Sequence, residues 1–170
     1  LDVGGYDGLL GEFLKEDEIF VMDKHKNDLN LENYIQGDAL NMPFEDNSYD
    51  IVTSLDVYEH VRESDRRKFI FEVLRVSKKY VILGFPFYNE DICLAENIIY
   101  EYIKREYGAI QEQLKEHIEN GLPRIDKVKK ILQEKNVKYF DFENGYINNW
   151  LLMMLTIYYI YGLENSEKLC

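Results

Sequence analysis

The sequence predicts an α/β fold with a mostly parallel central sheet and helices on both faces. Apolar, strand-forming runs alternate along the chain with amphipathic helical stretches, which is the order typical of parallel sheets. A cluster of glycines follows the first apolar run, and an acidic residue ends each of the next two runs. Ligands of such sheets bind beyond the carboxyl ends of the strands, so these glycines and acids mark a candidate site.

The first part of the chain supplies four of the expected strands. Residues 1–4 are interpreted as the end of a buried strand, and apolar residues at helical spacing predict a helix over about residues 7–15. Residues 18–23 and 33–38 are short strand-forming runs that each stop at an aspartate. Residues 49–57 are rich in β-branched side chains, which favours a central strand.

A helix, a strand and a second helix are expected next. Over residues 65–77 the apolar side chains share one helical face, and Ser64 or Asp65 can cap the helix start. Residues 80–87 form a near-continuous apolar run, the pattern of a strand that is covered on both sides. Apolar positions at helical spacing predict a long helix around residues 94–103.

The last third of the chain is less regular. A glycine and a proline predict a loop over residues 116–124, followed by a helix over 125–132 and an alternating strand over 137–144. The run 150–163 holds 14 residues without a charge, fewer than the roughly 20 that a membrane-crossing helix needs. A packed core helix is the preferred interpretation, and a self-association face is the alternative.

Composition limits the class of protein. With 170 residues, 46% of them hydrophobic, the chain is expected to form one domain. Leu1 is not a methionine and stands inside a strand, so we expect a chain that is truncated at one or both ends. Cys93 and Cys170 match no disulfide or zinc pattern, which favours the cytoplasm. A net charge of −12 argues against a nucleic-acid partner.

Two common nucleotide-binding motifs do not fit the glycine cluster. A dinucleotide motif that starts at Gly4 requires glycine where Tyr6 and Leu9 stand. The glycine, lysine and serine or threonine that end the phosphate loop of NTPases are absent from the sequence. A nicotinamide-dependent oxidoreductase is therefore disfavoured.

Another family does fit. The segments LDVGGYDG and GDALNMPFEDNSYDIVTSLDVYEHV resemble class I S-adenosylmethionine-dependent methyltransferases, in particular their small-molecule, "type 11" branch. EVLRVSKKYVILGFP continues the likeness, which covers residues 1–86. It implies a Rossmann-like three-layer sandwich in a single domain, 1–170. Residues 1–86 would bind the cofactor, and residues 87–170, with a helical insert and the apolar terminal helix, would form the substrate side.

The resemblance assigns S-adenosylmethionine as cofactor, with S-adenosylhomocysteine as product. The residues that it assigns to cofactor binding are Asp2, Gly4, Gly8, Asp23, Asp38, Ala39, Leu55 and Asp56. The glycines allow a sharp turn and a close approach of the backbone. Asp23 can accept hydrogen bonds from ribose hydroxyls, Asp38 and Ala39 would face the adenine, and Leu55 and Asp56 the methionine end. Tyr6 departs from the motif, because glycine is common at its position.

Three adjacent residues, Tyr58, Glu59 and His60, are the candidate catalytic residues, because a hydroxyl acceptor benefits from a base or a metal. The spacing from Asp56 to His60 resembles the Glu-x-x-Glu-His of some magnesium-dependent O-methyltransferases. Glu-His also occurs in metal-free members, so no metal is assigned and magnesium is the less favoured alternative. Glu59 and His60 are otherwise expected to organise the loop after the fourth strand.

Further candidates for an acceptor pocket lie in the second half. They are Tyr88, Asn89, Glu90, His117, Asn120 and Arg124. A histidine in a loop, such as the one expected at 117, is more often a surface residue than a ligand.

The predicted function is methyl transfer from S-adenosylmethionine to an oxygen of a small-molecule or glycan-type acceptor, with nitrogen less favoured. No membrane span is expected, and the apolar C-terminal helix is a candidate homodimer face. The alternative is a non-catalytic binding or assembly module with a methyltransferase fold.

Overall fold

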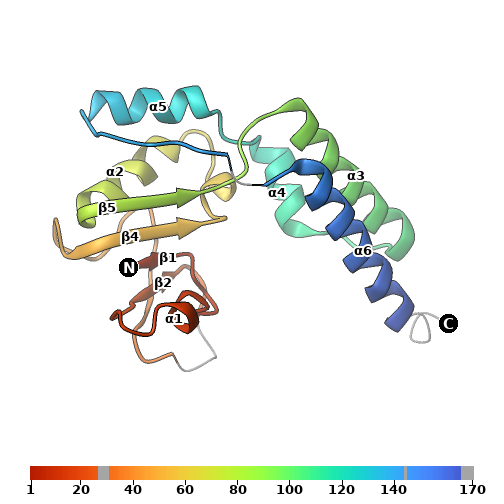
Figure 1. Ribbon diagram of the computed structural model, residues 1–170, viewed down its shortest axis with the longest axis horizontal. Coiled ribbons are helices and arrows are strands. Elements are labelled where there is room, and N and C mark those ends of the chain that lie inside the picture. The colour runs from red at the N-terminus through yellow and green to blue at the C-terminus, as the bar shows by residue number, and fades with distance from the viewer. Residues whose placement is uncertain (27–30, 144, 166–170) are drawn as a thin grey trace. The chain divides into compact units, whose positions relative to one another are not determined.

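The computed structural model describes residues 1–26, 31–143 and 145–165 (Figure 1). The chain forms two compact units, Leu1–Pro86 and Phe87–Cys170. The first unit holds a parallel sheet with flanking helices, and the described part of the second unit is helical. The predicted α/β class is therefore confirmed, whereas the single-domain organisation over residues 1–170 stays a prediction.

Five parallel strands form the sheet in the order β3-β2-β1-β4-β5. The strands are β1 (Asp2–Val3), β2 (Val21–Asp23), β3 (Tyr34–Gln36), β4 (Tyr49–Leu55) and β5 (Ser77–Gly84). Chain order reverses between β1 and β4, and this switch point is where open α/β sheets bind ligands. The loops that follow β1 and β4 therefore frame the candidate site.

The described residues of the first unit form three helical segments. They are α1 (Leu10–Phe13), the single 3₁₀ turn η1 (Tyr58–His60) and α2 (Arg66–Val76). Helix α2 packs on β4 and β5 through Phe69, Ile70 and Val73, which are fully buried. Helix α1 is shorter than the predicted stretch 7–15, because the backbone leaves the helical conformation at Leu14.

The prediction that residues 80–87 are covered on both sides is wrong. β5 is an edge strand, and its side chains Tyr80 and Ile82 are exposed together with Ile51 and Leu55 of β4. Helix α2 covers only one face of this strand pair. A continuous apolar run therefore does not by itself show that both faces of a strand are buried.

The second unit packs around one apolar cluster. Its helices are α3 (Glu90–Tyr107), α4 (Glu112–Asn120), α5 (Ile125–Glu134) and α6 (Ile147–Asn165). Ile99 and Ile103 of α3 and Leu114 of α4 are buried, and one face of α6 packs against them. Tyr107 also donates a hydrogen bond to the Tyr158 carbonyl, at 2.5 Å, which ties α3 to α6.

Two sequence-based assignments in this unit are wrong. The segment expected as a loop, 116–124, begins inside α4, where Leu114 and His117 lie one turn apart and are both buried. Residues 137–143 form no strand among the described part of the chain, and Phe140 is 97% exposed. In the part of the chain that the structure describes, the alternating pattern there has no neighbouring strand to pair with. Residue 144, the end of that predicted strand, lies outside the described residues.

Helix α6 is packed on one side only. Trp150, Leu151 and Met154 face the apolar cluster, whereas Leu152, Ile157 and Ile160 are exposed. The core-helix interpretation thus holds for one face of the helix. Among the described residues, no helix combines the length and the apolar content needed to cross a membrane.

Candidate functional site

The glycine loop after β1 makes an unusually tight turn. Gly4 and Gly8 have φ angles of +87° and +68°, a region that side chains other than glycine rarely adopt. A Cβ atom at Gly4 would overlap the side chain of Val57, which follows β4, and one at Gly5 would overlap the carboxylate of Asp2. The loop therefore lies directly against the end of β4, and its backbone lies at the switch point of the sheet.

Asp2 supports this loop from beneath. Its side chain is buried, and Oδ1 accepts a hydrogen bond of 2.8 Å from the Thr53 hydroxyl. Burial raises the pKa of the Asp2 carboxyl, and the bond from Thr53 opposes that change. The structure thus gives Asp2 a role in holding the loop, and a direct contact with the cofactor stays a prediction.

Asp23 is the last residue of β2 and anchors the turn that follows. Its Oδ1 accepts a hydrogen bond from the His25 amide at 2.8 Å. From β3, the Tyr34 hydroxyl donates to the His25 carbonyl at 2.7 Å, and the Gln36 amide donates to the Lys24 carbonyl at 3.1 Å. Within residues 1–26 and 31–143, no group donates to Oδ2 of Asp23, so this oxygen can accept from a ribose hydroxyl.

Tyr6, the departure from the motif, leans toward the same turn. Its ring meets the His25 ring edge to face, with the centroids 6.4 Å apart. Burial and the charge of Asp23 raise the pKa of Tyr34, which keeps its hydroxyl a donor. Tyr6, His25 and Tyr34 therefore gather around the turn that carries Asp23.

Asp38 and Ala39 lie just beyond the carboxyl end of β3. The Asp38 carboxylate is exposed, and its Oδ1 accepts a hydrogen bond from the Leu40 amide at 2.8 Å, which forms a tight turn. Gly37 donates to the Asp23 carbonyl at 2.8 Å, so the turn starts beside Asp23. The two acids predicted to bind the cofactor thus follow neighbouring strands at the same edge of the sheet.

Leu55 and Asp56 end β4 on the other side of the switch point. Asp56 has a φ of +53°, although it is not a glycine, and its amide donates to the Gly84 carbonyl at 2.9 Å. Such a conformation costs on the order of 1 kcal/mol and is enriched at functional sites. Both side chains are exposed, as binding to the methionine end of a cofactor would require.

The three candidate catalytic residues form η1, but two of them are buried. Tyr58 and Glu59 are 2% and 1% exposed, and the Tyr58 ring packs against Phe69 and Phe85. Burial raises the pKa of Tyr58 to about 12, against the opposing charge of Arg66. A phenol with this pKa stays protonated at neutral pH and is a poor base. His60 is the member of the trio with a partly exposed side chain.

In the second unit, Tyr88, Asn89 and Arg124 have local structural roles. Asn89 caps α3, since its Oδ1 accepts from the Asp91 amide at 2.8 Å. The Arg124 guanidinium lies 4.9 Å from the centroid of the Tyr88 ring, and the Tyr88 amide donates to the Pro123 carbonyl at 2.7 Å. Glu90 lies in the first turn of α3, where an acid is favoured by the helix dipole.

His117 is a buried residue, so the expectation of a surface histidine is wrong. It lies on the inner face of α4, whose last residue is Asn120, and its Nδ1 is 2.9 Å from Oε1 of the buried Glu96 on α3. Sequence reasoning missed Glu96. The signal was present, because Glu96 stands next to Ala95 and three residues before Ile99 on the buried face of α3. An acid in such a position is rare unless it is paired.

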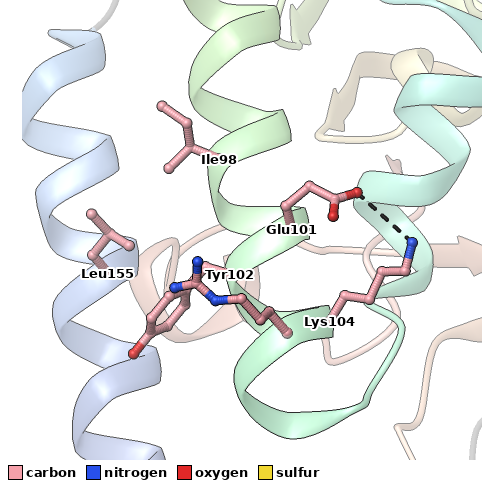
Figure 2. Close-up of a pocket in the computed structure, with 6 residues that line it drawn as sticks. Ile98, Glu101, Tyr102, Lys104 and Leu155 are labelled. Carbon is pink, nitrogen blue, oxygen red and sulfur yellow. Dashed lines mark ion pairs between the residues drawn. The ribbon is translucent and has the colours of Figure 1, made fainter.

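An open groove of about 540 Å³ lies between α3 and α6 (Figure 2). It is lined by Ile98, Glu101, Tyr102, Lys104, Arg105 and Leu155. Lys104 Nζ is 3.8 Å from Glu101 Oε1, so two of the charged groups neutralise each other at the rim. The groove has an apolar wall and no glycine turn, so it differs from the switch-point region of the first unit.

The residues at the switch point fit a nucleoside-bearing cofactor. The glycine turn has no room for a Cβ at Gly4 or Gly5, Asp23 offers one carboxylate oxygen, and Asp38 is exposed beside it. The fold and the site together are those of an α/β protein whose switch-point residues fit a nucleoside-type ligand.

Comparisons with known proteins find a methyltransferase domain in part of the chain. The family model described as "Methyltransferase domain" matches residues 14–84. Norajmaline N-methyltransferase of Rauvolfia serpentina is 46% identical over 41 residues, which are 24% of this chain and 13% of that protein. The match therefore spans only a small part of the length of that curated relative.

Solved structures show the same fold. The YcgJ protein of Bacillus subtilis is 19% identical with a TM-score of 0.57, over 90% of this chain and 69% of that one. An S-adenosylmethionine-dependent methyltransferase of Aquifex aeolicus is 18% identical with a TM-score of 0.51, over 82% and 72% of the two chains. A methyltransferase-domain model thus matches less than half of the chain, and the chain shares the fold of solved proteins that include an S-adenosylmethionine-dependent methyltransferase.

Proposed function

We propose that this protein transfers a methyl group from S-adenosylmethionine to an oxygen of a small-molecule or glycan-type acceptor, with nitrogen as the less favoured target. The observation that supports this most is the meeting of three features at one edge of the sheet. The glycine loop follows β1, Asp23 ends β2, and Asp38 follows β3. The matched methyltransferase domain, residues 14–84, contains both acids.

The residues of the first unit have separate tasks in this proposal. When bound, the cofactor supplies an electrophilic methyl group on a sulfonium sulfur. Gly4 and Gly8 let the backbone approach it, Asp23 Oδ2 accepts from the ribose, and Asp38 accepts from the adenine amino group. Holding both reactants in line supplies much of the rate of such a displacement, so positioning is the main contribution of the protein.

His60 is proposed as the group that takes the proton from an acceptor hydroxyl, at an imidazole nitrogen. It is partly exposed, and histidine is the side chain that most often serves as a general acid or base. Tyr58 and Glu59, which are buried, hold the turn that presents His60. No metal is needed for this role, and magnesium stays the less favoured alternative.

Recognition of the acceptor is proposed to rest on residues 87–170, with Tyr88 and Arg124 as candidates. The exposed face of α6 is proposed as a homodimer contact. Most of helix α6 lies in the longest uncharged stretch of a chain whose net charge is −12. Two copies therefore meet at this face with the least electrostatic repulsion. A helix that is apolar on both faces is normally buried on both. A cytoplasmic location remains the prediction from the sequence.

The test is calorimetric titration with S-adenosylhomocysteine. The parent is expected to bind it, and Asp23→Ala is expected to lose that binding. Asp50→Ala is the matched control, because Asp50 lies in the same sheet, near the amino end of β4, in an exposed pair with Lys79. No binding by a folded parent would refute the enzyme proposal and favour the non-catalytic module. With binding established, isotopically labelled S-adenosylmethionine and a screen of hydroxyl and amine acceptors would identify the target atom.

A further inference from the structure

The loop between β3 and β4 is held by a single arginine of α2. Arg75 Nη1 donates to the Phe44 carbonyl at 2.7 Å and to Asp46 Oδ1 at 3.0 Å. Its Nη2 donates to the Met42 carbonyl at 3.1 Å. One guanidinium thus contacts three residues of a loop that lies about thirty positions earlier in the sequence.

Glu72, one turn before Arg75, completes the attachment. It accepts from Arg75 Nε and Nη2, both at 2.8 Å, and its Oε2 also accepts from the Met42 amide at 2.9 Å. The hydrogen bond from Arg75 lowers the pKa of Glu72, so the carboxylate stays charged. Paired fork geometry of this kind is both strong and directional. We call Arg75 and Glu72 the α2 clamp.

The clamp fixes one end of the turn that carries Asp38 and Ala39. At the other end, the Gly37 amide donates to the Asp23 carbonyl in β2, at 2.8 Å. At Met42, both the amide and the carbonyl are bound by the clamp, and the side chain is buried. The turn 38–41 is therefore held at both ends. The end at Gly37 is bonded to strand β2, and the end at Met42 is bonded to helix α2.

We propose that Arg75 and Glu72 are positioning residues that set the selectivity of the site for a 6-aminopurine. They touch no cofactor atom themselves, and they act by holding Asp38 where its carboxylate meets the exocyclic amino group. This inference rests on the proposed function, because it assumes that the adenine of the cofactor lies beside Asp38. Without the clamp, the turn that carries Asp38 keeps its attachment at Gly37 and loses the one at Met42.

Selectivity is measured as the ratio of two dissociation constants, for S-inosylhomocysteine and for S-adenosylhomocysteine. The two ligands differ at the purine 6-position, where a carbonyl replaces the amino group. The ratio is independent of the fraction of folded protein, so a purely structural role would leave it unchanged. The parent is expected to favour S-adenosylhomocysteine by about tenfold or more, the usual effect of one hydrogen bond to a charged group.

In Arg75→Met the ratio is expected to fall to within about threefold of unity, with weaker binding of S-adenosylhomocysteine. Lys79→Met is the matched control, since it removes one exposed cation of the same unit whose partner, Asp50, belongs to β4 and not to the loop. It should keep the parent ratio. Glu72→Gln, which keeps the shape of the side chain, serves if Arg75→Met does not fold, and it is expected to lower the ratio by a smaller factor.

The outcomes separate this inference from the proposal beneath it. If the parent binds with selectivity and the folded clamp variants keep that selectivity, the inference is overturned and the proposed function stands. If the folded parent binds neither ligand, the proposed function fails, and the inference fails with it. A parent that binds both ligands equally also overturns the inference.

Discussion

Substituting Gly4 by alanine tests the close approach between the glycine loop and the end of β4. Gly4 combines a φ of +87° with the side chain of Val57 at the place that a Cβ would occupy. Gly108, which follows α3, has a φ of +62°, but apart from the adjoining chain nothing lies within 4 Å of the place where its Cβ would stand. The two glycines thus share the backbone conformation and differ in the space around it.

The magnitude follows from this difference. A left-handed conformation costs an alanine roughly 1–2 kcal/mol, and this applies at both positions. Overpacking against Val57, whose branched side chain has little freedom, adds about 1–3 kcal/mol at Gly4. We therefore expect Gly4→Ala to lower the free energy of unfolding by about 2–5 kcal/mol and Gly108→Ala by about 1–2 kcal/mol.

The assay is urea denaturation followed by circular dichroism, with S-adenosylhomocysteine titration of the variants that fold. Val57→Ala should relieve part of the overlap, so the double variant Gly4→Ala/Val57→Ala is expected to recover stability relative to the sum of the two single changes. Equal losses for Gly4→Ala and Gly108→Ala, or no recovery in the double variant, would refute the reasoning from the close approach.

Three further predictions concern other parts of the chain. His117→Leu leaves the buried carboxylate of Glu96 without its imidazole partner and should cost about 3–5 kcal/mol in urea unfolding; a loss below about 1 kcal/mol would contradict the buried pair. Because Arg75 lowers the Glu72 pKa below its ordinary 4.5, the native state binds fewer protons than the unfolded state. The stabilisation from this bond is fully present above the unfolded pKa and is lost as the pH falls through the folded pKa. The melting temperatures of the parent and of Glu72→Gln should therefore become equal in acid. Ile157→Lys, on the exposed face of α6, should lower the mass measured by light scattering with little change in melting temperature, and an unchanged dimer would exclude that face.

The strand-end acids could be predicted because their signal is local. Asp23 and Asp38 each stop a short strand-forming run, and parallel strands bring such ends to one edge of the sheet. The signal of Gly4 and Gly8 is local too, because they follow the first strand and their left-handed backbone needs glycine. These inferences needed only the order of the elements, and the sheet has that order.

Interactions between distant segments could not be predicted. Nothing local relates Arg75 to the carbonyls of Met42 and Phe44, and Glu96 pairs with a histidine on another helix. The loop expected at 116–124 reflects a similar limit. Gly121 marks the end of α4 correctly, but the helix before it is recognised only by the burial of Leu114 against α3.

Helix α2 contacts the loops on both sides of the switch point. At its last turn Arg75 holds the loop that follows β3, and in its first turn Arg66 donates from Nε to the Val61 carbonyl at 2.9 Å, just after η1. Both arginines bind backbone carbonyls, so they fix the course of a loop whatever side chains it carries. The buried apolar face of α2 fixes the position of the helix on β4 and β5. Because the two arginines bind the loops, the position of the helix also fixes the position of the loops. The packing of one helix therefore determines where both Asp38 and His60 are presented.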